Sequence, residues 1–421
     1  MKRIGTVIML SAALLTSFAL AGCKEKEKYV KIDDKTFPDY SLLSAAKRAD
    51  LDGDNKLSQS EIESATSIVL YMPKDLTGLE VFTNLETITI KDGENMQYEF
   101  KHFTNLRNLR IDGAWGSARI DLSANTKLET IYIDSNDLQE LVLPEGAPLK
   151  KFTLCSSKLK GIDLNSYKGL DYISFETNDY LTELVFRDFP ELTKLNCTTN
   201  KVLSTLNVSN CPKLKDFDCS ENALADLNCS GCGNIETFWC YKNYNLTSLD
   251  LCAFPKLTEL WCANNKFTEL DLSPCPELTK LICVECGLTS LDLSSTPKLK
   301  VLMCGGNPLN ELDVTCCPDI ESVSCWDCDL TRVNVTGCSN LHNLICMENK
   351  LSSLDLTGCT NLSGLDCYKN DLTSVDISMC PKLIDLLNTN GFQVSKEGYL
   401  VCRDKDGKAA IEFDETTEFI K

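Results

Sequence analysis

Histidine is scarce in this chain: the 421 residues contain only His102 and His342. Because histidine is the usual acid–base group near neutral pH and a common zinc ligand, its scarcity argues against most chemistry of that kind. Positive charge is also in deficit, with 42 Lys and Arg against 61 Asp and Glu and a formal net charge of −19. Such a chain lacks the basic surface that phosphate backbones require, so no nucleic-acid partner is expected.

The first residues have the pattern of a targeting segment. Two cations, Lys2 and Arg3, precede an apolar run from Ile4 to Leu20 that ends in small residues. A membrane-spanning helix is the alternative, but the run is short and no stop-transfer cluster of charges follows it. We therefore predict that residues 1–22 are a signal peptide.

The end of this segment, Leu20-Ala21-Gly22-Cys23, resembles the lipobox of bacterial lipoproteins. That resemblance implies cleavage before Cys23 and acylation of its thiol, so that the membrane is reached only through a lipid anchor. Residues 23–39 begin with alternating Lys and Glu and predict a solvated tether. By the same resemblance, Lys24 in place of Asp favours the bacterial outer membrane or cell surface.

An acidic loop lies between two short helical patterns in residues 40–66, which we predict to form an N-terminal cap. Its twelve residues, Asp50 to Glu61, place oxygen-bearing side chains at the spacing that suits a calcium ion with six to eight oxygen ligands. The candidate ligands are Asp50, Asp52, Asp54, Lys56 through its carbonyl, Ser58 through a water, and Glu61. The loop resembles an EF-hand, with Asn55 at the position that needs a left-handed turn and is usually Gly. An acidic turn without an ion remains the alternative to a structural calcium site.

A repeat of 21 or 22 residues governs the rest of the chain. It is most visible as a ladder of cysteines in the pattern Leu-x-x-Leu-x-Cys: Cys197, Cys219, Cys240, Cys262, Cys283, Cys304, Cys325, Cys346 and Cys367. Three residues after most of these positions lies an asparagine, such as Asn200 or Asn307, and Cys286 and Cys328 occupy two of the same slots. The second half of each repeat approximates Leu-x-x-Leu-Asp-Leu-Ser-x-Cys-Pro. Period-two alternation in both halves predicts two short strands per coil, and stacked coils bury one continuous core.

These repeats resemble the leucine-rich repeat family, whose pattern is L-x-x-L-x-L-x-x-N/C-x-L. The repeat length and the buried cysteine are most similar to internalin J-like bacterial surface proteins, which also begin with a truncated EF-hand-like cap. The resemblance covers Ile68 to Gly391. It implies a mainly β, right-handed curved solenoid over residues 67–391, used for adhesion or protein recognition. Residues 392–421 break the period and predict a β-hairpin cap.

The abundant cysteines invite a metal or disulfide reading, which the repeat argues against. Cys283 and Cys286, like Cys325 and Cys328, have a zinc-like Cys-x-x-Cys spacing, but it is only the distance between two slots of the repeat. In-register strands would hold neighbouring Cβ atoms about 4.8 Å apart, beyond the range that a disulfide prefers. The 24 cysteines are therefore expected to be mostly small buried core residues, with no metal bound to them.

Side chains that flank the buried ladder are predicted to point outward. The two sides of the solenoid differ in the type of residue found at these outward positions. The side that carries Leu-x-Cys is aromatic and aliphatic, and its predicted partner-binding residues are Trp239, Tyr241, Trp261, Ile282, Met303, Trp326, Met347 and Tyr368. The other side carries Asp, Ser and Thr, as in Asp271 and Asp292. Contiguous exposed apolar residues are typical of interfaces, although self-association or coverage by the terminal segment would also explain them.

The sequence thus predicts a lipid-anchored surface protein that binds a protein ligand on a host or neighbouring cell. A glycan-binding lipoprotein is the alternative, because Trp and Tyr also stack on sugars. No constellation of nucleophile, base and acid can be assembled from the regular coils, so no enzyme activity or catalytic cofactor is expected.

Overall fold

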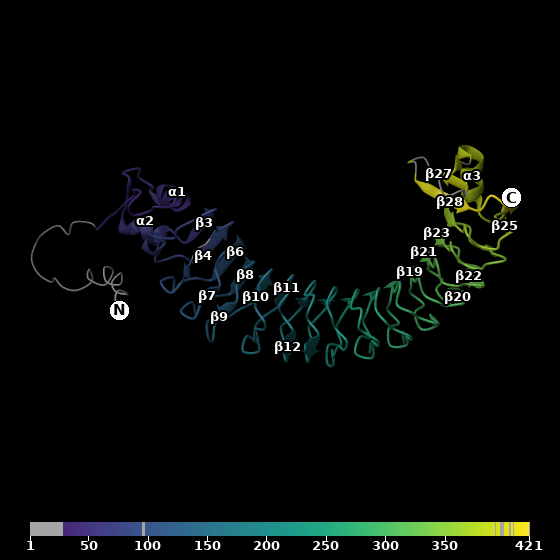
Figure 1. The fold of residues 1–421 in the computed structure, drawn as a ribbon, viewed down its shortest axis with the longest axis horizontal. Helices are drawn as coiled ribbons and strands as arrows, with labels where there is room; N and C mark the ends of the chain where they lie inside the picture. The colour runs from purple at the N-terminus through teal and green to yellow at the C-terminus, as the bar shows by residue number, and fades with distance from the viewer. Residues whose placement is uncertain are drawn as a thin grey trace, which may run out of the picture.

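The computed structural model describes residues 28–94, 97–391, 393–395, 400–403, 406 and 408–420. Within them the chain forms a mainly β, curved solenoid with a helical cap at its N-terminal end (Figure 1). The predicted signal peptide, Cys23 and the first residues of the tether lie outside the described residues. No helix in the described part of the chain is long and apolar enough to cross a membrane.

One long parallel sheet follows the concave side of the arc, with one strand from each coil (Figure 1). Neighbouring strands pair in register, as where Leu260 lies opposite Leu281. Leu260 and Cys262 are fully buried whereas Trp261 between them is half-buried, so the alternation predicted for this half-repeat is confirmed. The strands are β3 (Ser67–Tyr71), β4 (Thr87–Lys91), β6 (Asn108–Ala114), β8 (Thr130–Ser135), β10 (Lys151–Cys155), β11 (Tyr172–Glu176), β13 (Lys194–Asn196), β15 (Asp216–Asp218), β16 (Thr237–Trp239), β17 (Glu259–Trp261), β18 (Lys280–Ile282), β19 (Val301–Met303), β21 (Ser322–Ser324), β23 (Asn343–Ile345) and β24 (Gly364–Asp366).

On the convex side, regular pairing occurs in only some coils, so the prediction of two strands per coil holds in part. Short parallel groups form from β5 (Tyr98–Glu99), β7 (Arg119–Asp121) and β9 (Glu140–Val142), from β12 (Glu183–Arg187) and β14 (Thr205–Ser209), and from β20 (Glu311–Asp313) and β22 (Arg332–Asn334). Elsewhere, as at Leu270–Leu272, the half-repeat is extended but assigned to no strand. The curvature explains this, because bending a stack of coils spreads their convex edges beyond hydrogen-bonding distance.

From Asn178 to Asn370, the predicted asparagine ladder joins neighbouring coils by buried hydrogen bonds. The Asn307 side-chain amide donates to the carbonyls of Cys283 and Cys304, both at 2.8 Å. Its Oδ1 accepts from the backbone N–H groups of the preceding coil at Cys286, Gly287 and Leu288, at 2.9–3.0 Å. One buried side chain therefore pairs backbone groups that face neither water nor a regular strand.

Where cysteine replaces asparagine in this ladder, its side chain donates to the equivalent carbonyl of the preceding coil. The thiol of Cys286 donates to the Cys262 carbonyl at 3.1 Å, and that of Cys328 donates to the Cys304 carbonyl at 3.2 Å. A thiol is a weaker donor than an amide and has no oxygen to accept the N–H groups of the preceding coil. These two slots are therefore weaker copies of the same connection.

The first prediction concerns this ladder. Asn307→Ala should lower the free energy of unfolding by about 2–4 kcal/mol, because it leaves several buried backbone groups unpaired. Asn307→Cys should cost less, because the thiol can donate as Cys286 does. Asn361→Ala is the control: Asn361 lies at the surface, where its amide donates to the Ser339 carbonyl at 2.8 Å. Equal losses of melting temperature for Asn307→Ala and Asn361→Ala would contradict the role assigned to the ladder.

The N-terminal cap places two short helices beside the first coil. Helix α1 (Tyr40–Ala49) begins at Asp39, whose carboxylate accepts from the N–H groups of Ser41 and Leu42, and α2 (Gln59–Ser64) follows the acidic loop. Strands β1 (Val30–Lys31) and β2 (Lys56–Leu57) pair antiparallel beside them, and the single turn η1 (Leu79–Val81) follows β3. Leu42 and Leu57 are fully buried, which joins the cap to the solenoid core.

The C-terminal end differs from the prediction of regular coils to residue 391. Helix α3 (Pro381–Asn390) takes the place of the last expected strand, because Pro381 starts a helix and Leu383 and Leu387 share its buried face. The predicted hairpin does form between β27 (Leu400–Arg403) and β28 (Ala409–Phe413), with β26 (Gln393–Val394) on its other edge.

The same terminal segment extends both sides of the solenoid. Strand β28 adds in parallel to β24 on the concave sheet. Strand β29 (Glu418–Ile420) adds to β25 (Ser374–Asp376) on the other side. The end of the chain therefore completes a last coil, which covers two sheet edges that would otherwise be open.

The cysteines of the described residues are all free thiols, and most are buried. Burial raises the pKa of Cys275 to about 12 and places that of Cys283 well above its ordinary value. Among the described cysteines only Cys252 is exposed, and the hydrogen bond to the Asp250 carboxylate raises its pKa as well. A raised pKa and lack of access both slow reaction with thiol reagents.

The second prediction follows from these environments. In folded, unreduced protein, Cys252 should react with a thiol reagent before any buried cysteine, and Cys252→Ser should remove this first phase. In denaturant, still without reductant, the remaining cysteines of the solenoid should all become reactive. Mass spectrometry that found disulfides between adjacent coils, such as Cys283 to Cys304, would refute the core role of the ladder.

Candidate functional site: a concave aromatic surface

The outward residue that ends each of the strands β15 to β19 forms a row along the inside of the arc. From β15 to β19 the register places Asp218, Trp239, Trp261, Ile282 and Met303 on successive strands. Since strands in a sheet lie about 4.8 Å apart, this row is continuous. Figure 1 shows β19, β21 and β23 on the inner edge of the arc and β20 and β22 on the outer edge, so the row lies on the concave side.

Two tryptophans form the centre of this concave aromatic surface, which we define by the eight predicted partner-binding residues. The rings of Trp239 and Trp261 stack with centroids 4.8 Å apart and planes at 24°, and Tyr241 lies tilted at 6.3 Å from Trp261. In the described part of the chain, neither indole Nε1 has a hydrogen-bond partner, although both are buried. An unpaired buried N–H lowers stability, so this pair is poorly explained by the needs of the fold.

Trp261 already carries a cation supplied by the chain itself. The ammonium of Lys280 lies 4.5 Å from the centre of the Trp261 ring and 3.5 Å from a carboxylate oxygen of Glu259. The arrangement combines an ion pair with a cation–π contact on one indole face.

The Trp326 ring packs against Gly305 of the neighbouring coil. A Cβ added to Gly305 would stand 2.4 Å from the Trp326 ring, so the indole occupies the space that this glycine leaves free. Gly305 thus fixes where the indole sits on the concave aromatic surface.

Toward the C-terminus the surface ends earlier than predicted. Met303 is 37% exposed, whereas Tyr368 is only 9% exposed, where β28 adds beside β24. The expected availability of Tyr368 is therefore wrong, and at this end the alternative of coverage by the terminal segment holds. Burial together with the charge of Glu412 raises the pKa of the neighbouring Asp366 to about 7. Ile282, Trp326 and Met347 are half-buried members between these limits.

An acidic border lies on the N-terminal side of the tryptophans, which the sequence reasoning missed. Glu176 accepts from the Asn196 amide at 2.8 Å, and Asp218 accepts from the Ser220 N–H at 2.9 Å. Burial raises the pKa of Asp218, and the negative charges of Glu176 and Glu221 add to that effect. Counting the register back from Trp239 would have placed Asn196 and Asp218 in the same row.

The aspartates of the opposite side have a local structural role. The carboxylates of Asp271, Asp292 and Asp313 each accept from the backbone N–H two residues later, at 2.9 Å. The hydroxyl and N–H of Ser273 lower the pKa of Asp271, and the N–H and hydroxyl of Ser294 lower the pKa of Asp292. The backbone hydrogen bonds hold the turn that follows each half-repeat.

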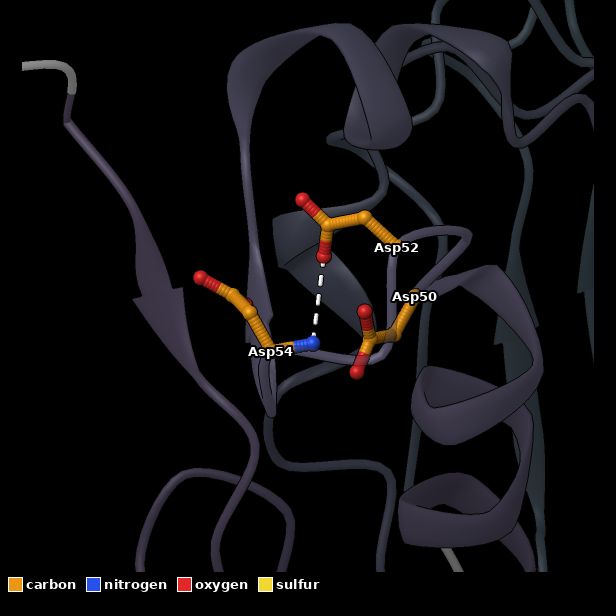
Figure 2. Close-up of side chains that lie close together, drawn as sticks. All are labelled: Asp50, Asp52 and Asp54. Carbon is orange, nitrogen blue, oxygen red and sulfur yellow. Dashed lines mark hydrogen bonds between the residues drawn. The ribbon is translucent and has the colours of Figure 1, made fainter.

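In the N-terminal cap, three of the predicted calcium ligands come together. Oxygens of Asp50, Asp52 and Asp54 lie within 4.8 Å of one another, the only such His, Cys, Asp or Glu group among the described residues. Figure 2 shows the three carboxylates around the loop, with the Asp54 N–H donating to Asp52 at 3.1 Å. Asn55 has a φ of 62°, so the left-handed turn expected at that position is confirmed.

Glu61 is engaged elsewhere. Its two oxygens accept from the Leu51 N–H at 2.7 Å and from the N–H and hydroxyl of Ser58 at 2.8 and 2.7 Å, in a capping box for α2. These hydrogen bonds, those of Ser58 foremost, lower its pKa to about 2. Because that lies below the ordinary 4.5, the stabilisation is present above pH 4.5 and is lost as the pH falls through about 2. Lys56 also competes for the site, since its ammonium lies 3.2 Å from Asp54.

Calcium binding by the cap therefore stays a prediction, which three residues fit directly. If the loop binds calcium, millimolar calcium should raise the melting temperature by mass action on the folded state. Asp52→Asn combined with Asp54→Asn should abolish that rise and leave the Glu61 capping box intact. Asp271→Asn, far from the cap, is the control. A wild-type melt that does not respond to calcium would refute the site.

Comparisons with known proteins bear on the fold. No protein-family model and no curated protein matched the chain. Among solved structures, YopM, a leucine-rich effector protein from Yersinia pestis, is 19% identical over 79% of this chain and 88% of its own, with a TM-score of 0.58. An internalin, InlF from Listeria monocytogenes, is 18% identical over 82% and 97%, with a TM-score of 0.50.

The functional domain of InlJ from the same organism, which includes a cysteine ladder, is 26% identical over 85% of this chain and 70% of its own, with a TM-score of 0.47. The expected mainly β leucine-rich repeat solenoid is confirmed by the coils of the structure and by the first two comparisons, whereas its right-handed curvature stays a prediction. The chain is a leucine-rich repeat solenoid with a buried cysteine ladder, and bacterial internalins are among its structural neighbours.

Proposed function

We propose that this chain is a bacterial surface protein, lipid-anchored through Cys23, that recognises a protein partner with its concave aromatic surface. The observation that carries the proposal is the stacked pair Trp239 and Trp261, continued by Ile282 and by the exposed Met303 on adjacent strands. Tryptophan, tyrosine and methionine are typical of the central part of protein interfaces.

The position of these residues supports a binding role over a structural one. Stability of the solenoid depends on inward residues such as Leu260 and Cys262, which are fully buried. The outward indoles leave two N–H groups unpaired. A concave sheet face is also rigid, because each strand is fixed by both neighbours, so binding requires little ordering of the surface.

Glycan binding is the second candidate. Carboxylate and amide groups beside an indole, as in Asp218, Asn196 and Trp239, could also hydrogen-bond to sugar hydroxyls while the ring stacks on the sugar. A glycan array probed with the full chain, set against a protein partner screen, separates the two candidates. We favour the protein partner because the aliphatic residues Ile282 and Met303 contribute apolar area with no hydrogen-bonding function.

The matching prediction uses one outward and one inward change on the same strand. Trp261→Ala should weaken partner binding by about 2 kcal/mol or more, roughly 30-fold, and should change the melting temperature little. Leu260→Ala, in the core beside it, should cost about 2–5 kcal/mol of stability. Asp271→Ala on the opposite side should have little effect on binding. The measurement is calorimetric titration of each variant with the partner that a screen identifies, alongside a thermal melt.

Two results would contradict the proposal. One is an equal loss of binding for Trp261→Ala and Asp271→Ala. The other is a loss of stability for Trp261→Ala that matches Leu260→Ala, since the indole would then be part of the core. Trp326→Ala repeats the test at a second outward tryptophan, and it should likewise weaken partner binding and change the melting temperature little.

A further inference from the structure

We propose that the pocket beside Trp239 receives a basic side chain, arginine or lysine, of the protein partner, between the Asp218 carboxylate and the indole. This inference rests on the proposed function, because the pocket opens on the concave aromatic surface. It adds the chemistry of the partner, which the apolar residues alone do not specify.

The pocket lies where the acidic border meets the tryptophans. Its volume is about 380 Å³, and its lining includes the carboxylate residues Asp216, Asp218 and Glu259 together with Asn196 and Trp239. Lys194 is the one cation in the lining. The formal net charge of −19 for the whole chain adds a long-range attraction for a cationic partner.

The chain itself shows what such a pocket accepts. One strand further along, Lys280 lies 4.5 Å from the Trp261 ring and 3.5 Å from the Glu259 carboxylate. An ammonium group between a carboxylate and an indole face is therefore a stable arrangement on this sheet. It is made there from three residues of the same surface.

Trp239 has no lysine at the position that Lys280 occupies relative to Trp261. Lys280 belongs to the strand that follows Trp261, and the residue in the same position on the strand that follows Trp239 is Glu259. Asp218 lies directly opposite Trp239 on the preceding strand. Trp239 thus has carboxylates on both neighbouring strands, and no cation lies over its ring among the residues that the structure describes.

The state of Asp218 supports the same conclusion. No salt bridge is formed by Asp218 within the described residues, whereas Glu221 nearby is paired with Lys242 at 3.0 Å. Burial and the neighbouring carboxylates raise the pKa of Asp218, so its charged form is stabilised too little by the chain alone. A partner cation would supply the missing charge.

An organic cation fits better than a metal ion. Among the described residues, the only group of three or more His, Cys, Asp or Glu side chains with ligand atoms within 4.8 Å of one another is Asp50, Asp52 and Asp54 in the cap. The carboxylates around Trp239 are spread along several strands and lie beside an aromatic face. That geometry suits a guanidinium or ammonium group on an aliphatic stem.

The test uses two short peptides and the four tryptophans of the chain. Acetyl-Gly-Arg-Gly-amide and its citrulline counterpart have nearly the same shape, but in citrulline a neutral urea group, with oxygen in place of one nitrogen, replaces the charged guanidinium. Titrated into the full chain, the arginine peptide should shift the indole N–H resonance of Trp239, assigned by a Trp239→Phe variant, in a saturable way. The citrulline peptide should bind at least about fivefold more weakly.

Asp218→Asn should weaken the arginine peptide to the level of the citrulline peptide. Its folding is checked by the melting temperature, since the Asn oxygen can still accept from the Ser220 N–H. Asp271→Asn, an acidic residue of the opposite side, should leave the titration unchanged. Lys280→Ala should free Trp261 and Glu259 for a second peptide, which the Trp261 resonance would report.

The outcomes separate this inference from the proposed function. Equal binding of the two peptides, no shift at Trp239, or an equal effect of Asp218→Asn and Asp271→Asn would overturn the basic-side-chain pocket. The proposed function would survive that result if Trp261→Ala still weakened the protein partner. Conversely, arginine-selective binding with a partner indifferent to Trp261→Ala would support the pocket and refute the proposed interface.

Discussion

The hydrogen bonds of the asparagine and cysteine ladder are the interaction on which the rest of this structure depends. Between Asn178 and Asn370 the coils turn backbone groups inward where neither water nor a regular strand can pair them, and Asn307 alone satisfies groups in two coils. The tight turn requires a left-handed backbone conformation at the residue before each ladder position, as in Glu285 at φ 53° and Asp327 at 48°. Non-glycine residues adopt that conformation only where surrounding contacts enforce it. The repeat length follows, since each ladder side chain must meet its predecessor.

Because inward residues stabilise the solenoid, the outward residues can vary and serve binding. The inward positions of the concave strands from β13 to β24 are Leu, Phe, Val and Cys, whereas the outward row changes from Asn196 and Asp218 to indoles and then to aliphatic residues. That gradient carries the proposed recognition: shape and apolar area from Trp261 to Met303, and charge from the acidic border. On the opposite side the aspartates have a structural role, because each accepts a hydrogen bond from the turn that follows it.

Both ends of the solenoid must be covered, and the chain covers them with different elements. At the N-terminal end, Glu61 ties the acidic loop to helix α2, so a residue that a calcium site would use already contributes to the cap. At the C-terminal end, β28 and β29 continue the two sides of the solenoid and bury Tyr368 in doing so. Closing an exposed sheet edge therefore set the limit of the candidate binding surface.

The sequence by itself determined the solenoid, the buried ladder, the outward position of Trp239 and Trp261, and the left-handed turn at Asn55, because each depends on a local pattern repeated at fixed spacing. Only the tertiary structure decided which side is concave, that α3 replaces a coil, that Tyr368 is covered, and that Asp218 and Glu259 flank Trp239. Those features depend on which side chains meet across coils, on curvature and on how the last strands close the edge. A local pattern contains none of this, since residues that pair between neighbouring coils are separated by 20 residues or more along the chain.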